Sequence, residues 1–182
     1  MTRIGAAFDR LRARRRKGLV AYLTAGDPDL ATTPALVVEA ARRGADIVEL
    51  GMPFSDPAAD GPIIEAAMER ALAAGTRVAG VLDAVRTIRR ESDVPLVLFG
   101  YVNPILQYGP ERFARDAAAA GADGLLIVDL PVEEAAEVLV PARKAGLDFV
   151  TLVAPTSTPA RVRRACEAAS GFVYYVSRTG VT

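Results

Sequence analysis

Short apolar runs alternate with longer amphipathic stretches along the whole chain. Ile4, Phe8 and Leu11 lie at helical spacing near the start and predict an amphipathic helix. The apolar runs predict strands at residues 19–25, 46–50, 95–101, 123–128, 147–153 and 171–176. The intervals between them are rich in alanine, arginine and glutamate and predict helices. This alternation is typical of an α/β protein.

The loops favour one of the two architectures that such strands permit. Continuously apolar parallel strands must be covered on both faces, which leaves a doubly wound sheet or a (β/α) barrel. Several helix-to-strand turns repeat one short pattern, as at Gly44-Ala45-Asp46 and Gly121-Ala122-Asp123, whereas each strand-to-helix loop is different. Distinct loops beyond every strand are typical of a barrel, where functional residues follow several strands. We therefore predict a (β/α)8 TIM barrel.

Only about six of the eight β/α units of such a barrel are present. The last predicted strand ends near residue 176, and a polar loop follows it. An eight-stranded barrel has roughly 250 residues, whereas this chain has 182. We expect a single barrel domain over residues 1–182, truncated after strand six, with its C-terminal part missing.

The amino-acid composition limits which binding partners and which cellular compartment we expect. Lysine plus arginine equals aspartate plus glutamate at 22 each, so no overall charge attracts nucleic acid or an anionic membrane. The sequence has no secretion signal and no apolar window near the roughly 20 residues of a membrane span. Cys166 is the only cysteine, and we expect it to be a small buried thiol in a cytoplasmic protein.

Glu49 is the first candidate for chemistry. It shares one face of the second predicted strand with Ile47, while Val48 and Leu50 share the other. If the apolar pair faces the helices, Glu49 points into the barrel mouth. Desolvation there would raise the pKa of its carboxyl group, which suits a group that both takes and gives a proton near neutral pH. The alternative is a structural glutamate paired with an arginine.

Asp60 follows in the longest loop, just before Gly61 and a predicted helix. Its structural alternative is an N-cap, because a carboxylate ahead of a helix accepts hydrogen bonds from free backbone N–H groups. Asp27, Asp56 and Asp129 also precede predicted helices, and a cap or turn role is the stronger interpretation of each taken alone.

Some chemistries are disfavoured by the residues that are missing. The absence of histidine and the single cysteine argue against a zinc site, so we expect no metal and no metal-dependent aldolase. Lys17 and Lys144 lie before the first strand and late in a helix, on the wrong face for a barrel Schiff base. Cleavage of a carbon–carbon bond would therefore depend on carboxylates and on an electron sink in the substrate.

One sequence run carries a specific resemblance. VELGMPFSDPAADGP at residues 48–62 resembles the signature of the tryptophan synthase alpha subunit family. Residues 22–28, 101–104, 128–134 and 177–182 agree with other family segments in the same order, so the resemblance covers the whole chain. It implies a lyase of tryptophan biosynthesis that cleaves indole-3-glycerol phosphate by a retro-aldol reaction into indole and D-glyceraldehyde 3-phosphate.

The resemblance also implies roles for individual residues. Glu49 matches the general acid/base, which removes the proton of the side-chain hydroxyl next to the ring and protonates indole C3. Asp60 matches the carboxylate that stabilises the positive ring nitrogen of the indolenine intermediate. Asp56 and Thr182 match two mobile loops that close over the substrate. The substrate-binding positions of the family are matched by Tyr22, Phe99, Tyr101, Asp129, Tyr174 and Gly180.

Two of these positions depart from the usual family residues. The family often has phenylalanine in place of Tyr22 and leucine in place of Phe99. Without the resemblance, the aromatic residues would be assigned to the barrel core. The phosphate-binding glycine-rich amides of the family follow strands seven and eight, so we expect them to be missing here and substrate binding to be poor.

A partner is implied by the resemblance alone. It is a tryptophan synthase beta subunit that uses pyridoxal phosphate and receives indole through a tunnel, in an alpha2beta2 heterotetramer. The alpha chain itself should need no cofactor. Two alternatives remain, because barrels support many chemistries: another phosphate-binding barrel isomerase or lyase, and a non-catalytic activator of a beta subunit.

Overall fold

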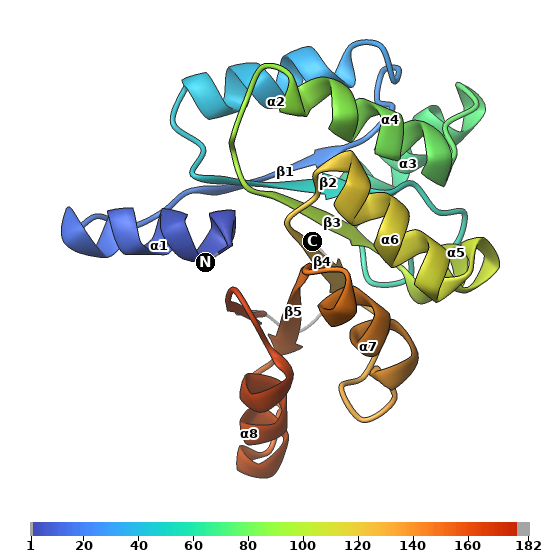
Figure 1. Ribbon diagram of the computed structural model, residues 1–182. Helices are drawn as coiled ribbons and strands as arrows, with labels where there is room; N and C mark the ends of the chain where they lie inside the picture. The colour runs from blue at the N-terminus through green and yellow to red at the C-terminus, as the bar shows by residue number, and fades with distance from the viewer. Residues whose placement is uncertain (1, 178–182) are drawn as a thin grey trace.

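A curled parallel sheet forms the centre of the protein (Figure 1). The computed structural model describes residues 2–177. Each strand pairs in parallel with the next in sequence, so β1 and β6 are the two edges of the sheet in the described part of the chain. The strands are β1 (Val20–Thr24), β2 (Ile47–Gly51), β3 (Leu96–Gly100), β4 (Gly124–Ile127), β5 (Asp148–Val153) and β6 (Val173–Tyr175). The six predicted strands and the partial (β/α)8 barrel are thereby confirmed.

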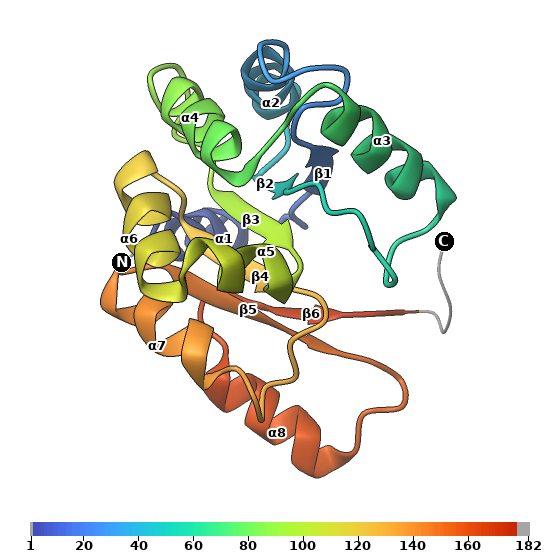
Figure 2. The same cartoon turned by 90° about the vertical axis from the view of Figure 1, so that its right-hand side faces the viewer.

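Helices cover the outer face of this sheet (Figure 2). The intervals after β2 and β3 each contain two helices, and the intervals after β1, β4 and β5 contain one. Within residues 2–177, no helix combines the length and the apolar character that crossing a membrane requires. The helices are α1 (Arg3–Ala13), α2 (Thr33–Arg42), α3 (Pro62–Ala73), α4 (Val78–Arg89), α5 (Val102–Tyr108), α6 (Pro110–Ala120), α7 (Ala136–Lys144) and α8 (Pro159–Ala168).

Strand alternation produces two separate cores. Val48 and Leu50 face outward and belong to the large core between the sheet and its helices. Ile47 faces inward and belongs to a smaller core inside the curl, together with Val150 from β5. Ile4 of α1 is fully buried in this inner core, so α1 covers the end of the sheet where the strands begin.

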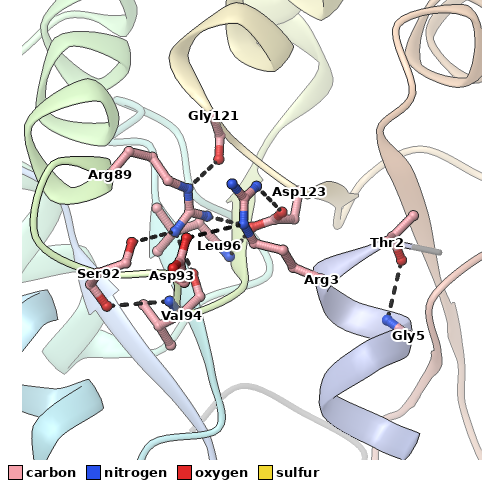
Figure 3. Close-up of polar contacts among 10 residues, drawn as sticks. All are labelled: Thr2, Arg3, Gly5, Arg89, Ser92, Asp93, Val94, Leu96, Gly121 and Asp123. Atoms are coloured by element: carbon pink, nitrogen blue, oxygen red, sulfur yellow. Dashed lines mark hydrogen bonds and ion pairs between the residues drawn. The ribbon is translucent and has the colours of Figure 1, made fainter.

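An ion-pair network around the buried carboxylate of Asp123 fixes α1 in this position (Figure 3). Asp123, just before β4, accepts hydrogen bonds from Arg3 of α1 at 3.0 Å and from the backbone N–H of Leu96 at 2.8 Å. It also pairs with Arg89 of α4, which donates further bonds to the carbonyl oxygens of Gly121 and Val94, each at 2.6 Å. The carboxylate of Asp123 is thus fully satisfied, as burial of a charge requires.

The prediction of a buried Cys166 is wrong, because the thiol is free and exposed. Helix α8 packs on β5 through Ala165, whose carbonyl oxygen accepts a hydrogen bond from Thr151 Oγ1 at 3.0 Å. Successive helical residues are about 100° apart, so Cys166 turns away from the sheet.

Candidate functional site

A cavity of about 470 Å³ opens at the carboxyl ends of the strands. Tyr22 of β1, Glu49 of β2, Phe99 of β3 and Tyr174 of β6 reach it from different strands. The loop after β2 contributes Asp60. This is the end of a (β/α) barrel where side chains from separate strands converge on one ligand. The remaining lining residues are Ala59, Ile64, Val128, Leu152, Tyr175, Val176 and Ser177.

Glu49 faces the inside of the curled sheet, as strand alternation predicts. It lines the cavity and is only 4% exposed. Its Oε1 atom has no hydrogen-bond partner in the part of the chain that the structure describes. The arginine-paired alternative is therefore not what these residues form. Burial raises the pKa of the Glu49 carboxyl to about 7, so near neutral pH it is a mixture of acid and base.

Asp60 is held by a tyrosine. The hydroxyl of Tyr101 donates a hydrogen bond to Asp60 Oδ2 at 2.6 Å and accepts one from the backbone N–H of Ala59 at 3.0 Å. The N-cap of α3 is Gly61, and no side chain caps that helix. Asp60 thus makes no capping bond. Burial raises the pKa of its carboxyl group, and the hydrogen bond from Tyr101 partly offsets this.

Aromatic rings form one wall of the cavity. The rings of Tyr22 and Phe99 meet edge to face, with centroids 5.1 Å apart. Tyr174 lines the same cavity from the edge strand β6. Edge-to-face packing leaves ring faces and apolar edges available to a flat aromatic ligand. The wall therefore suits a flat aromatic ring.

Tyr101 and Asp129, two of the predicted substrate-binding residues, are not among the residues that line this cavity. Tyr101 is 2% exposed and lies behind Asp60, because its hydroxyl bonds to that carboxylate and to the loop. Asp129 Oδ1 accepts the backbone N–H of Val102, the first residue of α5, at 2.8 Å. Asp129 borders a different cavity of about 350 Å³ beside β5 and α8. Asp129 therefore bonds to the start of α5, and not to the start of α7, the helix that follows it and whose N-cap is Ala135.

The predicted loop residues lie away from the cavity or beyond the described residues. Asp56 is exposed and accepts a hydrogen bond from the Ser55 hydroxyl. Gly180 and Thr182 lie outside residues 2–177.

Some residues that line the cavity were not predicted from the sequence. Leu152 and Val128 are inward-facing neighbours of the inner core and also border the cavity. Residues two apart in a strand share a face, so the inward direction of Val150 in β5 could have identified Leu152 as a lining residue. Ile64 comes from the helix after Asp60, and its position depends on how α3 packs, which the local pattern does not specify.

The site can exchange protons in a largely apolar setting. Two carboxyl groups with raised pKa values, Glu49 and Asp60, share a cavity walled by aromatic and aliphatic side chains. Glu49, whose carboxyl has a pKa of about 7, can act as an acid and as a base near neutral pH. Among residues 2–177, no group of three or more His, Cys, Asp or Glu side chains could hold a metal ion.

The family model and the similar sequences all carry the same description. The family model described as "Tryptophan synthase alpha chain" matches residues 8–182. A relative with that name from Geobacter sulfurreducens is 58% identical over 182 residues, which are 100% of this chain and 69% of the relative. Another, from Solibacter usitatus, is 57% identical over 100% of this chain and 68% of its own length.

Solved structures agree with the sequence matches. The crystal structure of tryptophan synthase subunit alpha from Legionella pneumophila superposes with a TM-score of 0.94 at 46% identity, covering 97% of this chain and 68% of that one. A chain of Mycobacterium tuberculosis tryptophan synthase has a TM-score of 0.94 at 44% identity, covering 100% and 70%. At these identities the likeness extends beyond the fold to the sequence.

Proposed function

Because the chain belongs to the tryptophan synthase alpha chain family, we propose that Glu49 and Asp60 carry out the reaction of that family in the cavity above the sheet. That reaction, a lyase step of tryptophan biosynthesis, cleaves indole-3-glycerol phosphate into indole and glyceraldehyde 3-phosphate. The observation that carries the proposal is the buried Glu49 carboxyl, which has a pKa of about 7 and an oxygen without a hydrogen-bond partner in the described part of the chain.

Glu49 acts as both acid and base in this mechanism. As an acid it protonates C3 of the indole ring, and as a base it takes the proton of the side-chain hydroxyl next to the ring. The O–H electron pair then forms the aldehyde C=O bond, and the electron pair of the broken carbon–carbon bond returns to the ring. Glu49 ends in its starting protonation state. A pKa near the working pH suits both transfers.

Asp60 stabilises the charge that appears on the ring. Protonation at C3 makes the ring nitrogen positive, and an ionised carboxylate in a partly desolvated site interacts strongly with that charge. The hydrogen bond from Tyr101 to Asp60 Oδ2 favours the ionised form. The ring itself is the electron sink, so the mechanism uses no group beyond the side chains of this cavity and the substrate.

The direct test is an assay for indole release from indole-3-glycerol phosphate, with and without a beta subunit. We expect wild-type protein to release indole and Glu49→Gln to lose that activity while still folding. An active Glu49→Gln protein would remove Glu49 from the mechanism. A protein that releases no indole yet stimulates a beta subunit would instead be the non-catalytic activator.

We also propose the partner of the family for this chain: a beta subunit that holds pyridoxal phosphate, in an alpha2beta2 assembly. One of the similar solved structures is that of Mycobacterium tuberculosis tryptophan synthase. The exposed loop with Ser55 and Asp56 borders a surface hollow lined also by Phe54, Glu65 and Glu69, which could accept such a partner. The free thiol of Cys166 agrees with a cytoplasmic location.

A further inference from the structure

The hydroxyl of Tyr22 lies just beyond Glu49 on the cavity wall. Tyr22 is the β1 partner of Glu49 in the sheet register, so the two side chains start side by side on the inner face. A Cβ atom built on Gly51 would lie 2.1 Å from the Tyr22 hydroxyl oxygen, so the phenol tip rests on the Gly51 backbone. Gly51 is two residues after Glu49, on the same face and about 6.6 Å farther toward the mouth.

The proton of this hydroxyl is available to a ligand. Thr24 Oγ1 donates a hydrogen bond to the Tyr22 oxygen at 3.3 Å, which leaves the O–H group of Tyr22 as a donor. Within residues 2–177, the hydroxyl donates no hydrogen bond to a protein acceptor. Burial, together with the nearby charges of Asp60 and Glu49, raises the pKa of Tyr22 to about 12. The phenol therefore remains a neutral donor at physiological pH.

We propose that Tyr22 is a further catalytic residue, which donates a hydrogen bond to the substrate oxygen that becomes the aldehyde oxygen of the product. This proposal rests on the proposed function. The substrate hydroxyl must lie within hydrogen-bond reach of Glu49 to give up its proton. An oxygen placed between the Glu49 carboxylate and the Tyr22 hydroxyl donates to the first and accepts from the second.

The bond from Tyr22 strengthens as the reaction proceeds. When the substrate hydroxyl transfers its proton to Glu49, negative charge builds up on the oxygen until the C=O bond has formed. A fixed donor in a desolvated site stabilises that charge more than it stabilises the neutral hydroxyl, so it lowers the barrier without tightening ground-state binding. Tyr22 keeps its own proton throughout.

The test is Tyr22→Phe, which removes the hydroxyl and keeps the ring packed on Phe99. We expect kcat for indole release to fall roughly 10- to 100-fold, with KM changed by less than about threefold. The affinity for indole should stay within about twofold of wild type, because indole lacks the oxygen that Tyr22 binds. Tyr108→Phe is the matched control, since that hydroxyl bonds to Asp116 outside the cavity; its kinetics should match wild type.

Two outcomes would overturn the assignment: kcat of Tyr22→Phe within about threefold of wild type, or an equal loss of turnover and of indole affinity, which would indicate a role in ring packing alone. Glu49→Gln measured in parallel separates this proposal from the one it rests on. If Glu49→Gln is inactive and Tyr22→Phe is unaffected, only the role of Tyr22 fails. If Glu49→Gln is active, the proposed function fails first.

Discussion

The two ends of the sheet bury carboxylates equally deeply and use them in opposite ways. Asp123, at the closed end beneath α1, is 6% exposed, and two arginines and a backbone N–H group surround it. Glu49, at the open end, is 4% exposed and has an oxygen without a hydrogen-bond partner among residues 2–177. Burial alone therefore does not distinguish a structural acid from a reactive one.

The difference follows from where each carboxylate lies along its chain segment. Asp123 precedes β4, where it can reach the N–H group of Leu96 and the arginines of the surrounding helices. Glu49 lies within β2 and points into the curl, where its neighbours are aromatic and aliphatic. The partners of Asp123 compensate its charge, whereas the cavity leaves the carboxyl of Glu49 to be satisfied by a ligand.

The largest expected effect is on catalysis at the open end. Glu49→Gln keeps the shape of the side chain but cannot exchange protons, so indole release should fall at least about 10²- to 10⁴-fold. Circular dichroism should show an unchanged fold. Asp83→Asn is a suitable control, because Asp83 lies on the exposed surface and pairs only with Arg86 nearby on α4. Its activity should equal that of the wild type.

At the closed end the corresponding change should act on stability. Arg89→Met removes a partner of buried Asp123 and should lower the free energy of unfolding by about 3–5 kcal/mol. Urea denaturation measures this. Arg86→Met, on the same helix, breaks only the exposed pair with Asp83 and should cost no more than about 1 kcal/mol. Equal losses in the two variants would contradict the importance of the network.

A pH series sharpens the contrast, because the contribution of Glu49 to stability should change with pH. The folded-state pKa of Glu49, about 7, is above its unfolded value of 4.5. Below pH 4.5 the carboxyl is neutral in both states and burial is favourable. As pH rises through 7, that advantage is lost, by about 3 kcal/mol in total.

Glu49→Gln lacks this titration, so the stability of the variant relative to wild type should rise by that amount between pH 4 and pH 8. Urea midpoints of both proteins across the range provide the measurement. A constant difference between the two would mean that Glu49 titrates normally.

The smallest effect is expected at Tyr101. Tyr101→Phe removes the donor to Asp60 and the acceptor of the Ala59 N–H group, so the pKa of Asp60 should rise further and indole release should fall about tenfold. A pH–rate profile would show the loss mainly on the acidic side. An unchanged profile would mean that Tyr101 does not position Asp60.

Strand periodicity predicted the central part of this arrangement. The six parallel strands and the inward direction of Glu49 follow from alternating side chains in apolar runs. The partner of Asp60 does not, because Tyr101 is 41 residues away and its hydroxyl meets the loop only in the folded protein. Asp129 and Tyr101 both lie just past strand ends, where alternation no longer fixes the direction of a side chain, and neither is among the residues that line the cavity.

The position of α1 has a consequence for the order of assembly. Arg3 contacts Asp123, 120 residues later in the chain, and Ile4 packs with Val150. During synthesis the first helix emerges long before the strands that form its binding surface. It can take its final place only after β4 and β5 exist, so α1 docks later than it is made. Contacts so distant in sequence are slow to form, because closing a long loop is entropically costly.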